Sequence, residues 1–104
     1  SNQLPTLIYD EADTGISGEV AGKMAFQFRE LGKSHQVISI SHLPQVAAAG
    51  NQQLEVFKVN TNNTTASRVR ELNNEERIRS IAVMLSGKDI SEAAIENAKQ
   101  LLSF

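Results

Sequence analysis

The order of apolar and polar positions in the first half of the chain predicts a strand, a helix and a second strand. Residues 5–9 form a short, partly β-branched apolar run that predicts a buried strand, and Asp10 and Glu11 follow it directly. Residues 19–31 carry apolar side chains at helical spacing, namely Val20, Met24, Phe28 and Leu31. Residues 37–41 predict a second strand. Two strands joined through a helix by short links predict a parallel βαβ unit with a right-handed crossover.

The rest of the chain predicts a short helix, a β-hairpin and two longer helices. Residues 43–49 predict the short helix, with a proline near its first turn and Gly50 after its end. Residues 53–60 and 65–72 predict two strands, and the polar residues 61–64 predict the hairpin turn between them. Two apolar stripes at helical spacing then predict the longer helices; they are Ile78, Ile81, Ala82 and Leu85, followed by Ile95, Ala98 and Leu102.

Cap signals bound these two longer helices. Asn73 and Glu76 have the spacing of a capping box at the start of the first of them. Gly87 stands where that helix is expected to end. Asp89 and Glu92 predict a second cap, at the start of the last helix.

The candidate chemistry gathers at the ends of the two predicted parallel strands. Asp10 and Glu11 follow the first strand and His42 follows the second, so all three are expected at one edge of the sheet. Open α/β sheets bind their ligands at this carboxyl edge. In phosphoryl transfer, one carboxylate holds Mg²⁺ and another orients the attacking water. A strand followed by an acidic turn and a surface histidine would give the same pattern, so a non-enzymatic α/β interaction module is an alternative.

Composition and charge narrow the classes of function. The 104 residues contain no cysteine, which excludes a disulfide scaffold and cysteine-ligated zinc. The formal net charge of −2 argues against broad, purely electrostatic binding of nucleic acid. Lys58, Arg68 and Arg70 are expected to line one face of the hairpin, where a solvated strand face is the simpler interpretation and a DNA contact the alternative. Residues 1–2 are interpreted as a remnant of expression.

Two segments carry a resemblance to a known family. Residues 9–18 read YDEADTGISG and residues 41–47 read SHLPQVA. They resemble the Walker B strand with its D-loop and the switch histidine of ATP-binding-cassette ATPase heads, most closely those of the RecN family of SMC-like bacterial DNA repair proteins. The resemblance runs through essentially the whole chain. It implies the C-terminal portion of a P-loop NTPase head, forming a single partial domain over residues 1–104.

The resemblance also implies roles for individual residues. Asp10 would support Mg²⁺, in part through water, Glu11 would polarise the hydrolytic water, and His42 would reach the γ-phosphate of ATP. The D-loop would face a partner head, and its residues are Asp13, Thr14, Gly15, Ile16 and Ser17. Many ATP-binding-cassette heads end this loop with aspartate where this chain has Ser17, a departure that favours the RecN branch over transporters and other heads. Independently of the resemblance, Ser17 or Gly18 is a candidate cap for the first helix.

At the level of the whole protein, the resemblance implies an ATP hydrolase in double-strand break repair. The implied cofactors are ATP and Mg²⁺, and the implied partners are a second copy of the head and DNA, in the bacterial cytoplasm at the nucleoid and without a membrane. A phosphate-binding loop needs the pattern G-x-x-x-x-G-K-[ST], which residues 18–24 and 27–34 only approach. The family's signature motif is also missing. We therefore expect these residues alone to bind ATP weakly or not at all and to be inactive.

Overall fold

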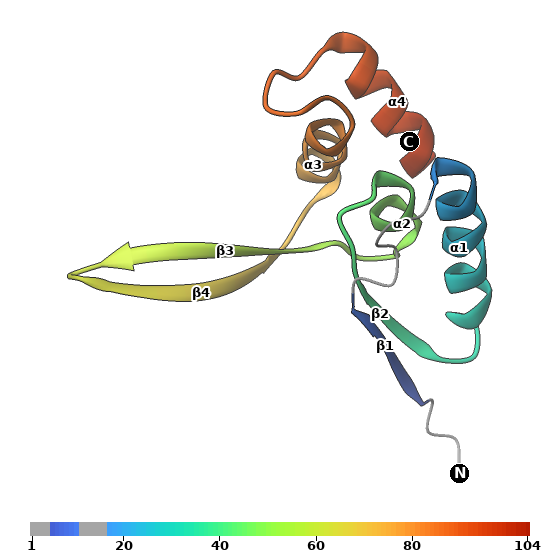
Figure 1. Ribbon diagram of the computed structural model, residues 1–104, viewed down its shortest axis with the longest axis horizontal. Coiled ribbons are helices and arrows are strands. Elements are labelled where there is room, and N and C mark those ends of the chain that lie inside the picture. Colours follow the sequence, from blue (N-terminus) through green and yellow to red (C-terminus); the bar gives the residue numbers. More distant parts are fainter. Residues whose placement is uncertain (1–4, 11–16) are drawn as a thin grey trace.

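The computed structural model describes residues 5–10 and 17–104 of the chain and has α/β architecture (Figure 1). In chain order, the elements are β1 (Thr6–Asp10), α1 (Gly18–Leu31), β2 (Gln36–Ile40), α2 (Pro44–Ala49), β3 (Leu54–Thr61), β4 (Thr64–Glu71), α3 (Asn74–Ser86) and α4 (Glu92–Leu102). The type and order of these elements confirm the sequence-based prediction. Among the helices of the described residues, none combines the length and apolar character needed to cross a bilayer.

The first half of the chain forms the predicted parallel βαβ unit. Strands β1 and β2 pair in parallel, with a register that runs from Thr6 opposite Gln36 to Asp10 opposite Ile40. Helix α1 connects them and covers one face of this two-stranded sheet, where the rings of Tyr9 and Phe28 lie with their centroids 4.7 Å apart.

The buried face of α1 differs from the predicted stripe. The most buried residues of this helix are Ala21 and Ala25, whereas Val20 is 47% exposed. Alanine has the smallest apolar side chain, so these two positions let α2 lie close against α1 (Figure 1). Met24 and Phe28, from the predicted stripe, are only half-buried.

The core lies where α3 and α4 pack on α2. Ile81, Ala82 and Ala98 are fully buried there, and Ala48 of α2 belongs to the same cluster. The predicted stripe of α3 is correct except at its end, because Leu85 is 38% exposed. The cap of α4 is also corrected: Ser91, not Asp89, accepts the hydrogen bond from the backbone N–H of Ala94 at 3.0 Å.

Helix α3 begins with the predicted capping box. The Asn73 side chain accepts from the Glu76 N–H at 2.9 Å, and the Glu76 carboxylate accepts from the Asn73 N–H at 2.9 Å. Each bond satisfies a backbone donor that the first turn of a helix leaves without a partner. At the other end, Gly87 follows the helix with φ of 80°, a backbone conformation that glycine tolerates best.

Replacing Asn73 by alanine removes the side-chain oxygen of this capping box. We expect the free energy of unfolding to fall by about 0.5–2 kcal/mol, the usual cost of losing such a cap. Urea unfolding followed by circular dichroism measures the change. Asn74→Ala is the matched control, because Asn74 is the exposed neighbour and makes no capping bond in the structure. Equal midpoints for the two variants would contradict the assigned cap.

Strands β3 and β4 form an antiparallel hairpin that extends away from the helices (Figure 1). Asn62 and Asn63 make its turn with φ of 43° and 68°, in the left-handed region that asparagine tolerates. In the register Lys58 lies opposite Ser67 and Phe57 lies opposite Arg68, so Lys58 and Arg68 are on opposite faces. The expectation of one basic face on the hairpin is therefore wrong.

The parallel sheet has one uncovered apolar face. Side chains alternate along a strand, so Ile8, Ile38 and Ile40 point away from the face that α1 covers. They are 66%, 42% and 52% exposed. Parallel sheets in proteins normally have both faces buried. This face therefore has the composition of a buried surface without a cover among the described residues.

Candidate functional site

The parallel register brings two of the predicted site residues to the same edge of the sheet. Asp10 ends β1 and pairs with Ile40, which ends β2, and His42 follows two positions later. Both side chains are exposed, so both are open to a ligand at this edge. Parallel pairing in this register is the physical reason that residues 32 positions apart in the sequence reach one edge.

The other predicted site residues divide between described and undescribed parts of the chain. Glu11 and the D-loop residues Asp13, Thr14, Gly15 and Ile16 lie outside the described residues. Ser17 is described, and its side-chain oxygen accepts a hydrogen bond from the Val20 N–H at 3.3 Å, which makes it the N-cap of α1. Of the two candidate caps, Ser17 and Gly18, Ser17 is therefore the N-cap, and Gly18 is the first residue of the helix.

Short-range contacts fix the backbone around His42. The Leu43 N–H donates to the Ser41 hydroxyl at 3.0 Å, which ties the two residues flanking His42 together. Pro44 then begins α2, where its missing N–H costs no helical hydrogen bond. Val46 and Ala48 of α2 are buried, so packing also holds this helix in place. His42 thus stands on the N-terminal side of a packed helix.

Two arginines bind the C-terminal end of the same helix. The Arg77 side chain, from α3, donates through Nη2 to the Ala47 carbonyl at 3.3 Å and to the Gly50 carbonyl at 2.9 Å. The Arg29 side chain, from α1, donates to the Ala49 carbonyl at 3.4 Å. The last carbonyls of a helix have no partner within it and carry partial negative charge, so a cation is well suited to this position.

Arg77 was not identified from the sequence. It is only 8% exposed, and burial lowers its pKa because desolvation disfavours the charged guanidinium. None of the ion pairs among the described residues includes it; its third bond runs from Nε to the Gln53 side-chain carbonyl at 3.3 Å. The available signal was its position four residues before Ile81, on the buried face of α3.

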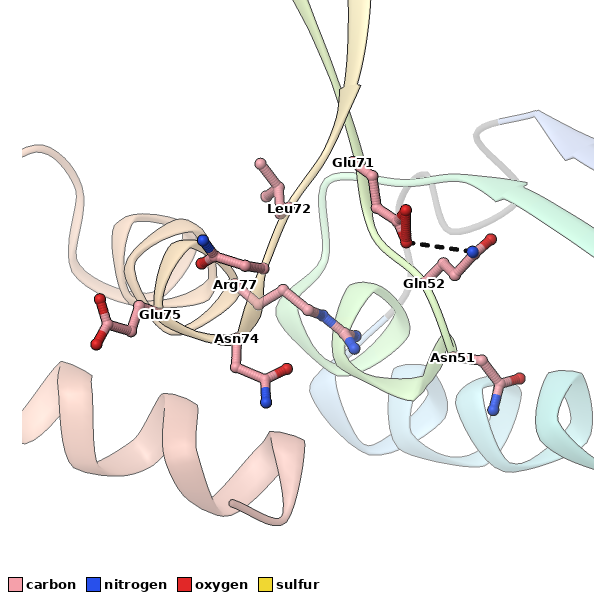
Figure 2. A pocket seen from close by; sticks show the side chains of 8 residues that line it. Asn51, Gln52, Glu71, Leu72, Asn74, Glu75 and Arg77 are labelled. Carbon is pink, nitrogen blue, oxygen red and sulfur yellow. Dashed lines mark hydrogen bonds between the residues drawn. The ribbon is translucent and has the colours of Figure 1, made fainter.

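An open cavity of about 700 Å³, lined mostly by polar residues, lies at the base of the hairpin, beside the start of α3 (Figure 2). Gln52 donates to the Glu71 carboxylate across it at 3.2 Å. Its lining residues are Asn51, Gln52, Glu71, Leu72, Asn73, Asn74, Glu75 and Arg77. None of them is a predicted site residue, so this cavity and the carboxyl edge of the sheet are separate features.

The described part of the carboxyl edge fits Mg²⁺ in one limited way. Residues 5–10 and 17–104 contain no group of three or more histidine, aspartate or glutamate side chains that could hold a metal ion. Asp10 contributes one exposed carboxylate. One or two carboxylates suffice for Mg²⁺ where the ion keeps several waters and binds phosphate oxygens. The single carboxylate of Asp10 could therefore be only one ligand of such an ion, and it does not form a metal cage by itself.

These features define the class of protein. The chain is an α/β segment whose parallel βαβ unit carries a carboxylate and a histidine at its carboxyl edge, where sheets of this kind bind ligands.

Comparison with known proteins identifies the family. No family model matches the chain. It is 44% identical over 98 residues to DNA repair protein RecN of Vibrio cholerae, a match that covers 94% of the chain. It is 40% identical to the proteins of the same name from Haemophilus influenzae and Streptomyces coelicolor, over 95% and 98% of the chain. The chain belongs to the RecN family and corresponds to the C-terminal part of its members.

The matched region is a small part of each relative. The chain spans 18% of the length of these three proteins. The family resemblance noted in the motifs of residues 9–18 and 41–47 is confirmed by these matches.

Proposed function

We propose that the chain is part of an SMC-like ATPase that acts in DNA repair and recombination. The observation that carries the proposal is the parallel register that sets Asp10 and His42 at one edge, in a chain 44% identical to DNA repair protein RecN of Vibrio cholerae. A strand end with a carboxylate, beside a strand end followed by an exposed histidine, is suited to a phosphate and its metal ion.

In this proposal, each residue at the edge has a distinct task. Asp10 supports Mg²⁺, partly through water, and the ion neutralises charge on the phosphates when bound. Glu11 polarises the attacking water, and His42 contacts the γ-phosphate. The D-loop of residues 13–17 faces a second copy of the head, and DNA is bound by the full-length protein. The whole protein acts in the cytoplasm, at the nucleoid.

The same proposal makes these 104 residues inactive by themselves. Phosphates in this class of enzyme are held by a glycine-rich loop, and the chain has no sequence with the required spacing. The exposed face of Ile8, Ile38 and Ile40 supports this view, because it has the apolar character of a surface that further chain covers. The proposed P-loop NTPase head therefore needs sequence beyond this segment.

Isothermal titration calorimetry with ATP and Mg²⁺ tests the proposal. We expect no resolved heat of binding for the 104-residue chain and saturable binding for a RecN-length protein that contains it. The physical reason is that most phosphate contacts come from the glycine-rich loop. Absence of binding in both proteins would favour the non-enzymatic interaction module. Binding of ATP by the 104-residue chain would contradict the proposal that most phosphate contacts come from sequence outside it.

A further inference from the structure

Helix α2 depends on its neighbours for its position. It has only six residues, and no side chain caps its N-terminus. Helices this short are unstable in isolation, because too few internal hydrogen bonds offset the cost of ordering the backbone. The contacts that other elements make with α2 therefore decide where it lies and, with it, where the adjoining residue His42 lies.

Arg77 makes the most extensive of the polar contacts with this helix. Its guanidinium bonds the carbonyls of Ala47 and Gly50 at the C-terminal end and the side chain of Gln53 beyond it. Figure 2 shows the Arg77 side chain extending from α3 toward the end of α2. A planar guanidinium can serve three acceptors at fixed angles, whereas an ammonium group is a point charge on a flexible stem.

Gln53 connects the same contact to the base of the hairpin. Its side chain is 9% exposed and donates to the Ser80 hydroxyl at 2.9 Å while accepting from Arg77. Its backbone carbonyl accepts from the Leu72 N–H at 2.9 Å. Buried polar groups of this kind hold a defined geometry when their bonds are satisfied, because any displacement leaves one of them without a partner.

From this network we infer that Arg77 is a positioning residue for His42, acting through α2. A helix of six residues is a rod of about 9 Å, so fixing its C-terminal end restricts its N-terminal end. Arg77 makes no bond with His42 itself. The role assigned to His42 in phosphate contact rests on the proposed function, whereas the mechanical link between Arg77 and His42 does not.

The link is tested on the 104-residue chain by Arg77→Lys, which keeps the charge and loses the forked geometry. We expect NMR signals of the His42 ring and of the α2 amides to shift. Hydrogen exchange of the Ala47 amide, which bonds the Leu43 carbonyl at 3.0 Å, should accelerate about tenfold. The ring of His35, the chain's other histidine, should not shift. Arg79→Lys is the matched control, because Arg79 is exposed on the same helix.

A second variant keeps the test decisive if Arg77→Lys fails to fold. Gln53→Met removes the acceptor of the Arg77 Nε bond with little change in side-chain length, and the same His42 and Ala47 signals should respond in the same direction. If the folded variants leave those signals as they are in Arg79→Lys, the inference is overturned. A purely structural role would lower the unfolding midpoint without selective shifts at His42 and α2.

Steady-state ATP hydrolysis by a RecN-length protein separates this inference from the proposed function. We expect Arg77→Lys to lower kcat several-fold with little change in KM, because His42 is misplaced while nucleotide binding is retained. If the parent protein does not hydrolyse ATP, the proposed function fails and the NMR result still decides the link. If the parent hydrolyses ATP and Arg77→Lys leaves both kcat and the His42 signals unchanged, the inference fails alone.

Discussion

Replacing Ile81 by alanine is expected to lower the free energy of unfolding of the chain by about 2–5 kcal/mol. Ile81 is fully buried, with no exposed surface, in the cluster where α3 and α4 pack on α2. Truncation removes its contacts and leaves a cavity that rigid neighbours fill only in part. Domains of this size are stable by only about 5–15 kcal/mol, so the loss is a large share of the total.

Thermal and urea unfolding, followed by circular dichroism, measure this effect. Val83→Ala is the matched control, because Val83 is an aliphatic residue of the same helix that is 39% exposed. We expect its midpoint to stay close to that of the parent, since little buried surface is lost. Similar losses in the two variants would show that the core is not centred on Ile81.

The elements that were predicted correctly are those that local sequence determines. The capping box at Asn73 and Glu76 is formed by two side chains and the backbone of one turn, so its spacing alone reveals it. The parallel pairing of β1 and β2 follows from the order strand, helix, strand. The location of Asp10 and His42 at the same edge of the sheet then follows from this pairing.

The errors concern packing between distant segments. Helix α1 buries Ala21 and Ala25 rather than the larger Val20, because the close approach of α2 selects small side chains there. Lys58 and Arg68 lie on opposite faces of the hairpin, because the register between its strands decides which residues share a face. The burial of Arg77 has one local signal, its position four residues before Ile81, but its bonds to the end of α2 have none. The burial of the two alanines and the faces of Lys58 and Arg68 have no local signal either.

A similar distinction applies to the candidate site. The geometry of Asp10 and His42 is part of the described fold, whereas the role of Glu11 rests on the resemblance of residues 9–18 to a Walker B motif. Mutation of Glu11 is consequently the most informative test of the catalytic role assigned to this edge of the sheet. A carboxylate that accepts a proton or orients water can be replaced by an amide of the same shape, which removes its charge and basicity.

Glu11→Gln in a RecN-length protein is expected to lower the kcat of ATP hydrolysis by about 10²–10⁴-fold, the usual contribution of a positioned general base. The affinity for ATP should change little, because the amide keeps the size of the carboxylate while it cannot polarise the water. Glu19→Gln is the matched control, since Glu19 is exposed in the first turn of α1, where it forms an ion pair with exposed Lys23. Phosphate release measures turnover, and calorimetry measures binding. Unchanged turnover in Glu11→Gln would remove the catalytic role from the acidic pair, and parallel losses of binding and turnover would assign Glu11 to nucleotide affinity instead.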